Sequence, residues 1–204
     1  MSQDHKLKEG DEVVWSIEAT NKSEIIFFTS MQQAYKARLY DFDDSKASVL
    51  GDYLPAKLGM DEGETPLYAL LPGDYKGSMV VAFQNGKAAR FSLQSFETKT
   101  NRRRLSGAYS DKSPAVGFFF PVDDETEITM FSTANRALTF RAGMLDIKAT
   151  RSTQGVQTMV LRGKHTVTRA CRTEDANLLD QARYRCRSIP SIGALLTEDQ
   201  LKFE

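Results

Sequence analysis

The sequence predicts an all-β protein made of propeller-like repeats, because one hairpin pattern occurs three times and helical periodicity is scarce. The clearest copy is the stretch 78–96, SMVVAFQNGKAARFSLQSF. At its centre, Asn85-Gly86 favours a type I′ turn between an apolar run and the alternating residues Ala89, Phe91 and Leu93. This stretch therefore predicts a β-hairpin.

The same pattern returns at 24–42, EIIFFTSMQQAYKARLYDF, and at 127–145, EITMFSTANRALTFRAGML. The far ends of the three copies are separated by 54 and 49 residues, a spacing typical of propeller-type blades of about four short strands. We expect equivalent core positions in the three copies. They are Phe28, Phe83 and Phe131 at the end of the first strand, Ala34, Ala88 and Ala137 at the start of the second, and Phe42, Phe96 and Leu145 at the far end.

Each hairpin is followed by a glycine-containing crossover and a third strand, expected at 66–71, 116–120 and 165–171. The repeats then cover about 24–71, 78–120 and 127–171. Upstream, Val13, Trp15, Ile17 and Ala19 alternate with other residues and predict a half-buried leading strand within 11–20, the tail of a repeat whose beginning is missing. The sequence thus indicates three to four blades in an open arc.

The connecting segments complete the expected organisation. Residues 1–10 are polar and predict a flexible lead-in, and Gly51 and Pro55 divide 46–58 into short extended pieces. Residues 174–183 favour a short helix, and 184–196, with Pro190, an edge strand or an extended return. The repeat domain would span 11–196, leaving 197–204 as a tail in which Thr197 and Gln200 have capping-box spacing.

Composition excludes several classes of protein. Two cysteines, Cys171 and Cys186, and two histidines are too few for a disulfide framework or a metal site of the cysteine–histidine kind, which favours free thiols in a reducing compartment. No apolar run approaches the roughly 20 residues of a membrane span, and the N-terminus is too polar for a signal peptide. We expect a cytoplasmic, nucleoid-associated protein without a membrane partner.

The sequence also lacks the usual marks of catalysis. It has no G-x-S-x-G nucleophile elbow, and the stretch from Gly155 to Lys164 has the wrong spacing for a phosphate loop. The carboxylates at 41–44 and 123–127 have no glycine or histidine framework and favour solvated turns. We therefore expect no catalytic residue, no metal, no cofactor and no small-molecule substrate.

Charge gives the functional signal. Residues 1–75 carry 7 basic and 14 acidic side chains, whereas residues 76–204 carry 20 and 13. Because stacked repeats place equivalent positions on one rim, the cations of the crossovers and hairpins would form a band that binds a phosphate backbone. The alternatives are a solubilising surface of mixed charge or a protein-interaction scaffold. The candidate DNA-binding residues are Lys99, Arg102, Arg103, Arg104, Lys148 and Arg151 in the crossovers, and Lys36, Arg38, Lys87, Arg90, Arg136 and Arg141 in the hairpins.

Several stretches resemble the C-terminal domain of bacterial type IIA topoisomerase A subunits, those of gyrase and topoisomerase IV. They are YKARLYDF, AARFSLQSF, ASVLGDYLPAKLGMDEGE, TKTNRRRLSGAYSDKSP and STQGVQTMVL, and the similarity runs from about Asp11 to about Leu196. The resemblance implies a β-pinwheel, whose blades exchange strands with their neighbours. It also implies a non-catalytic domain that binds and bends duplex DNA along a basic outer rim.

The resemblance further implies partners: the ATPase B subunit, together with the remainder of the A subunit.

Two features depart from the family pattern. Gyrase domains carry a box of the form Q-R-R-G-G-x-G, whereas the stretch 101–107, NRRRLSG, keeps the arginines without the paired glycines. The family usually has five or six blades, whereas this sequence has three repeats and a leading strand.

Overall fold

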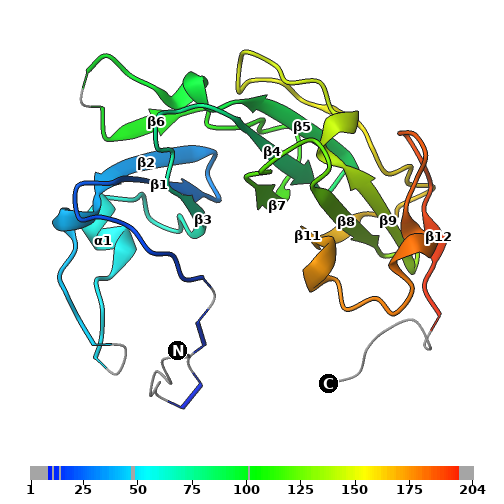
Figure 1. Cartoon of the computed structure of the whole chain (residues 1–204), viewed down its shortest axis with the longest axis horizontal. Helices are drawn as coiled ribbons and strands as arrows, with labels where there is room; N and C mark the ends of the chain where they lie inside the picture. Colours follow the sequence, from blue (N-terminus) through cyan, green and yellow to red (C-terminus); the bar gives the residue numbers. More distant parts are fainter. Residues whose placement is uncertain (1–8, 11, 14, 47–48, 101, 198–204) are drawn as a thin grey trace.

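The computed structural model describes residues 9–10, 12–13, 15–46, 49–100 and 102–197. Within these residues the chain forms three four-stranded antiparallel sheets, which stand side by side as blades along an open arc (Figure 1). The elements are short strands with few helical turns. The all-β, propeller-like prediction is therefore confirmed, with three blades.

Each blade takes three strands from one repeat and its outermost strand from a later stretch of chain. Blade 1 has the order β3-β1-β2-β6, with β1 (Glu24–Thr29), β2 (Gln33–Arg38), β3 (Pro66–Leu70) and β6 (Arg104–Ser106). Blade 2 has the order β10-β5-β4-β7, with β4 (Ser78–Phe83), β5 (Lys87–Ser92), β7 (Ala115–Phe119) and β10 (Val156–Gln157). Blade 3 has the order β11-β8-β9-β12, with β8 (Glu127–Ser132), β9 (Arg136–Arg141), β11 (Val167–Arg172) and β12 (Ala194–Leu195).

The second and third crossovers do more than connect strands. β6 lies in the second repeat but pairs with β2 of blade 1, where Leu105 is opposite Ala34. β10 lies in the third repeat but pairs with β5 of blade 2, where Val156 is opposite Ala88. This is the strand exchange that the family resemblance implies. It places these two crossovers on the convex side of the arc (Figure 1).

The central hairpins have three-residue turns. Gly86 has a φ of 83°, whereas Asn85 has no positive φ, so the type I′ prediction is wrong and the connection has a single left-handed residue at its end. Gln32 and Asn135 hold the same position in the other hairpins, with φ of 54° and 53°. A Cβ on Gly86 would lie 2.3 Å from the carbonyl oxygen of Met159, so the incoming crossover requires glycine here.

The blades stack face to face, and successive residues of a central strand point to opposite neighbours. In β1, Ile26 and Phe28 pack toward blade 2, and Ile25 and Phe27 pack toward the opposite side. This two-sided burial explains the continuous apolar runs of the central strands. The core between blades 1 and 2 includes Phe28, Met79, Val81, Phe83, Phe91 and Phe96, and that between blades 2 and 3 includes Val80, Ala82, Ile128, Met130 and Phe140.

The strand register corrects one set of equivalent positions. Phe28 pairs with Ala34 and Phe131 with Ala137, but the residue opposite Ala88 is Ala82, not Phe83. The prediction for Phe83 is therefore wrong by one residue. Because side chains alternate along a strand, Phe83 points back to the core between blades 1 and 2, while Ala82 packs toward blade 3. Phe131 also differs from Phe28, since it is only partly buried.

The helical segments differ from the expectations. Residues 54–58 form α1 (Leu54–Leu58) instead of an extended piece, because Pro55 favours the first turn of a helix and Gly59, with φ of 67°, ends it. The short helix expected at 174–183 is replaced by the 3₁₀ turns η4 (Thr173–Asp175) and η5 (Gln181–Tyr184), which pack against blade 3. The remaining 3₁₀ turns follow the three hairpins: η1 (Leu39–Asp41), η2 (Leu93–Phe96) and η3 (Ala142–Met144).

The predicted leading strand is wrong for the described residues between 12 and 20, which form no strand. Val13, Trp15 and Ile17 are about half exposed and lack the neighbouring strand that a half-buried strand needs. After Tyr184 the chain forms single β-bridges at Arg185 and Ser191, bends over 187–190 between them instead of running extended, and ends in the edge strand β12. The predicted capping box at Thr197 and Gln200 lies partly outside the described residues.

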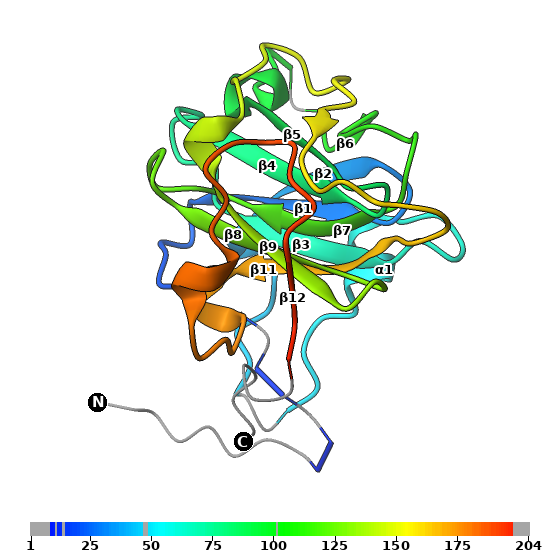
Figure 2. The same cartoon turned by 90° about the vertical axis from the view of Figure 1, so that its right-hand side faces the viewer.

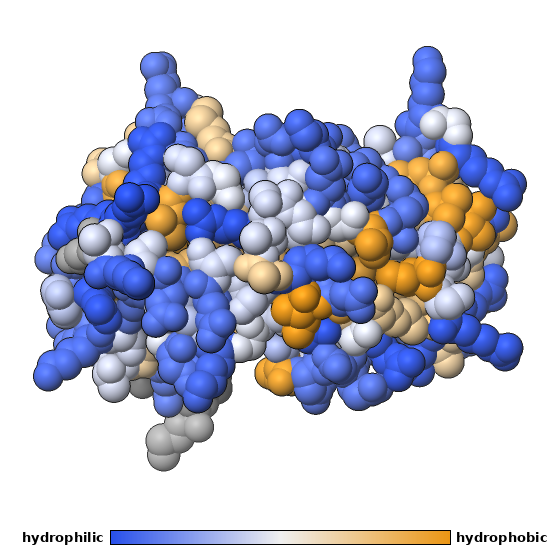
Figure 3. Space-filling view, turned by 90° about the horizontal axis from the view of Figure 1, so that it is seen from above, coloured by the Kyte–Doolittle hydropathy of each residue, from blue (hydrophilic) through white to orange (hydrophobic). Residues whose placement is uncertain are grey.

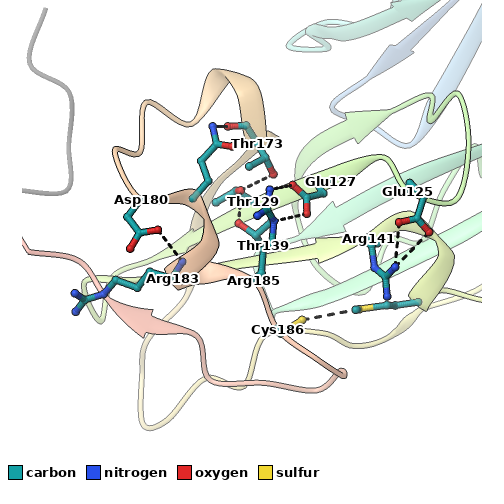
Figure 4. Close-up of polar contacts among 12 residues, drawn as sticks. Glu125, Glu127, Thr129, Thr139, Arg141, Thr173, Asp180, Arg183, Arg185 and Cys186 are labelled. Atoms are coloured by element: carbon teal, nitrogen blue, oxygen red, sulfur yellow. Dashed lines mark hydrogen bonds and ion pairs between the residues drawn. The ribbon is translucent and has the colours of Figure 1, made fainter.

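The outward face of blade 3 is covered by the chain itself, as Figure 2 shows with this blade toward the viewer. Thr129 lies at its centre, with its hydroxyl 2.7 Å from that of Thr139 and 2.9 Å from that of Thr173 (Figure 4). At the edge, the guanidinium of Arg185 contacts the carboxylate of Glu127, with an Nε–Oε1 distance of 2.6 Å. Three buried threonine hydroxyls therefore lie together on the outward face of blade 3.

The two cysteines, Cys171 and Cys186, are free, half-buried thiols, and burial raises the pKa of both. No helix in the described part of the chain is long and apolar enough to span a membrane.

Candidate nucleic-acid interface

The crossover between η2 and β6, which lies on the convex side of the arc, carries three exposed cations. The side chains of Lys99, Arg102 and Arg103 are exposed, and none of them has a hydrogen-bond or ion-pair partner among the described residues. Charges of this kind are available to an external phosphate, since no internal contact has to be broken. These three residues are called the rim cations.

Arg104, the next residue, is engaged within the protein. Its guanidinium makes a forked contact with Asp61 and also donates to the side-chain oxygen of Gln33. It lies 5.8 Å from the centre of the Tyr35 ring. The Arg104 guanidinium, followed by the Gln33 amide, lowers the pKa of the Asp61 carboxyl. Arg104 therefore joins β6 to the loop before β3.

A buried carboxylate fixes that loop. Glu64 is 5% exposed and accepts hydrogen bonds from the Tyr35 hydroxyl at 2.8 Å, from the Asp61 backbone N–H at 2.8 Å, and from the Thr29 hydroxyl. Burial, and then the hydrogen bond to Glu64, raise the pKa of Tyr35 to about 12. The network holds Asp61 in place under Arg104. No local pattern indicated it, because the acidic turn at 60–65 is typical of a solvated loop.

Arg151 is partly buried against the neighbouring crossover. Its guanidinium donates to the carbonyl oxygens of Gly107 at 3.0 Å and Ser106 at 3.3 Å, and also to that of Ser95. It lies 5.0 Å from the centre of the Phe96 ring. Partial burial lowers the pKa of this arginine.

Lys36 and Arg90 occupy equivalent positions in β2 and β5, and both are buried, at 9% and 6% exposure. Lys36 Nζ donates to the carbonyl oxygen of Phe96 at 3.1 Å, in the 3₁₀ turn of the next blade. Arg90 donates to the carbonyl oxygen of Ala142 at 3.0 Å, in the corresponding turn of blade 3. These two cations link neighbouring blades and are not presented at the rim.

The remaining candidates are dispersed. Arg141 contacts both oxygens of Glu125, and Arg136 donates to the carbonyl oxygen of Gly193 at 2.8 Å. Lys148 is exposed and 3.9 Å from Asp146. Two more residues complete the set: Arg38, which pairs with Glu24 and the carbonyl oxygen of Lys22, and Lys87, which is half-buried at the start of β5.

One exposed basic turn was not among the predicted residues. Arg162 and Lys164 flank Gly163, which has a φ of 61°, and both side chains are exposed without a partner among the described residues. The R-G-K-H pattern at 162–165 was a local signal for this turn. Figure 3, which looks down on the convex side, shows a mostly hydrophilic face with scattered apolar patches, the larger ones toward the end that carries blade 3.

Comparison with solved structures gives three matches in fold. The match to the C-terminal domain of DNA topoisomerase IV covers 86% of this chain and 55% of that structure's chain, with a TM-score of 0.70 and 19% identity. The match to the E. coli ParC C-terminal domain covers 83% of this chain and 71% of that structure's chain, with a TM-score of 0.61 and 15% identity. The match to the DNA gyrase A C-terminal domain covers 84% of this chain and 55% of that structure's chain, with a TM-score of 0.52 and 17% identity.

The chain has the β-pinwheel fold of topoisomerase C-terminal domains. In sequence, it is 31% identical over 99 residues to the gyrase A protein of Thermotoga maritima. That match covers 48% of this chain and 12% of the relative. No family model matches the chain. The resemblance in the sequence is thus confirmed, and this β-pinwheel spans a small part of the curated relative that it matches.

Proposed function

We propose that this β-pinwheel binds duplex DNA without sequence preference and bends it, as the accessory domain of a type IIA topoisomerase A subunit. The observation that carries the proposal is the crossover with the rim cations Lys99, Arg102 and Arg103, which is held on the convex side by strand exchange. Guanidinium and ammonium groups that have no partner among the described residues suit phosphate oxygens, and contacts of this kind carry no base information.

The partners follow from the same proposal. A DNA-binding accessory domain acts on a segment that a separate catalytic region cuts and rejoins, so its partners would be the ATPase B subunit, together with the remainder of the A subunit. The domain itself would have no nicking, ligating or ATP-hydrolysing activity. DNA as ligand would place the protein in the cytoplasm, in association with the nucleoid.

A protein-interaction scaffold is the second candidate, and the first crossover favours it. Leu50 and Tyr53 are 84% and 74% exposed, and exposed apolar side chains that cluster can mark a protein contact. The two candidates differ in what they require of the rim cations. DNA binding depends on them, whereas a scaffold that uses the first crossover does not.

Fluorescence anisotropy with labelled duplexes of unrelated sequence tests the proposal. We expect similar affinities for all duplexes and a steep loss of affinity with salt, because each phosphate contact contributes a slope of about 0.9. Energy transfer between dyes on the ends of a duplex of about 40 base pairs should rise on binding, since a bent duplex brings its ends together. Absence of binding at low salt, or binding confined to one sequence, would contradict the proposal.

A further inference from the structure

The contacts of Arg151 join both ends of the crossover that carries the rim cations. Ser95 lies in η2, before the rim cations, and Ser106 and Gly107 lie at and after the end of β6. The backbone carbonyl oxygens of all three accept hydrogen bonds from one guanidinium, through its Nη1, Nη2 and Nε. Arg151 thus closes the base of the loop between Phe96 and Leu105.

We propose that Arg151 is a positioning residue for DNA binding, which fixes the loop of rim cations without contacting phosphate itself. The proposal rests on the proposed function. A loop whose ends are held in place loses less conformational freedom when its side chains bind a ligand, so the clamp lowers the entropic cost of binding. Arg151 comes from the following repeat, so one repeat prepares the cationic loop of the repeat before it.

The geometry argues against a direct phosphate contact. Three of the five guanidinium N–H groups are already directed at carbonyl oxygens, and the group lies 5.0 Å from the centre of the Phe96 ring. Turning toward solvent would leave those carbonyl oxygens without this donor. Lysine cannot replace the arginine here, because a single ammonium cannot reach three acceptors in a fixed fork.

Hydrogen–deuterium exchange tests the clamp without DNA. In Arg151→Ala and in Arg151→Lys, amides of the segment 102–109 should exchange about tenfold faster than in the parent, since charged hydrogen bonds to the segment are lost. Arg169→Ala is the matched control. Its guanidinium also donates to a carbonyl oxygen, that of Asp175 at 2.9 Å, and lies 5.3 Å from the Phe131 ring centre, but it belongs to blade 3.

Duplex DNA binding provides the second readout. Both Arg151 variants should bind a fixed duplex about three- to tenfold more weakly, with the slope of log affinity against log salt unchanged. A phosphate-contacting arginine would behave differently. Its loss to alanine would make the slope shallower by nearly one, and lysine would restore both slope and affinity.

The outcomes distinguish the positioning role from DNA binding as such. Unchanged exchange at 102–109 in both variants, or a shallower slope for Arg151→Ala with full rescue by lysine, would overturn the positioning role. Unchanged DNA affinity in both variants, while Arg102→Ala/Arg103→Ala weakens binding, would overturn it as well. If the parent binds no DNA, the proposed function is contradicted. If both Arg151 variants nevertheless exchange faster at 102–109, the clamp itself is still supported.

Discussion

The buried cations of the hairpins and the exposed cations of the second crossover show how different the roles of similar residues are in this arc. Arg90 lies between blades 2 and 3 and contacts Ser78, Asp124 and the carbonyl oxygen of Ala142. Arg102 and Arg103 belong to the crossover on the convex side of the arc (Figure 1), and their side chains are exposed, with no partner among the described residues. The first position stabilises blade stacking, and the second is available to a ligand.

The comparison shows that counting charges along the sequence overestimates the cationic surface. Lys36, Arg90, Arg104 and Arg151 are engaged by carbonyl or carboxylate oxygens of the protein itself. Two of them, Lys36 and Arg90, are buried, and burial of a cation costs desolvation energy that its hydrogen bonds must offset. Interior and rim can therefore be separated by experiment, because substitutions in the two regions should change different quantities.

The largest expected effect concerns the apolar interior. Phe28→Ala should lower the free energy of unfolding by about 3 to 5 kcal/mol, because the buried ring packs against Phe96 and Phe118, with centroids 5.3 Å and 5.9 Å away. Phe131→Ala should cost clearly less, since that ring is partly exposed. Chemical denaturation measures both, and equal costs would show that the outward face of blade 3 is packed like an interior face.

Arg90 and Arg102 provide the most direct contrast between interior and rim. Arg90→Ala should lower the free energy of unfolding by about 2 to 4 kcal/mol, because it leaves Ser78 and the carbonyl oxygen of Ala142 without their charged donor. Arg102→Ala should stay within about 0.5 kcal/mol of the parent. Denaturation curves of the two variants check this, and equal stabilities would contradict the bridging role of Arg90.

A smaller effect is expected at alkaline pH. The folded pKa of Tyr35 is raised to about 12 from the ordinary value of 10.0, so the unfolded chain ionises first as the pH rises. The corresponding contribution to stability is complete below about pH 10 and is lost as the pH rises toward 12. Denaturation at several pH values should show a weaker decline in Tyr35→Phe than in the parent. An identical decline in both would contradict the raised pKa.

The sequence predicted what depends on local pattern. The three hairpins follow from turn residues and apolar runs, as in 78–96, and the structure confirms them. Strand exchange left no local pattern, because β6 and β10 are three and two residues long and pair with distant strands. The buried cations could not be recognised for the same reason. Arg90 stands in a strand whose two faces are both covered, and two of its three partners, Asp124 and Ala142, come from the following repeat.

The central claim is that the rim cations, which have no partner in the described part of the chain, contact DNA, and that the cations engaged within the protein do not. The salt dependence of duplex binding tests this claim most directly. Relative to the parent, Arg102→Ala/Arg103→Ala should make the slope of log affinity against log salt shallower by nearly two. Arg104→Ala is the matched control from the same crossover. It should leave the slope unchanged, because its guanidinium is held by Asp61. An unchanged slope in the double variant would contradict the account. So would a slope that becomes as much shallower in Arg104→Ala as it does per residue in the double variant.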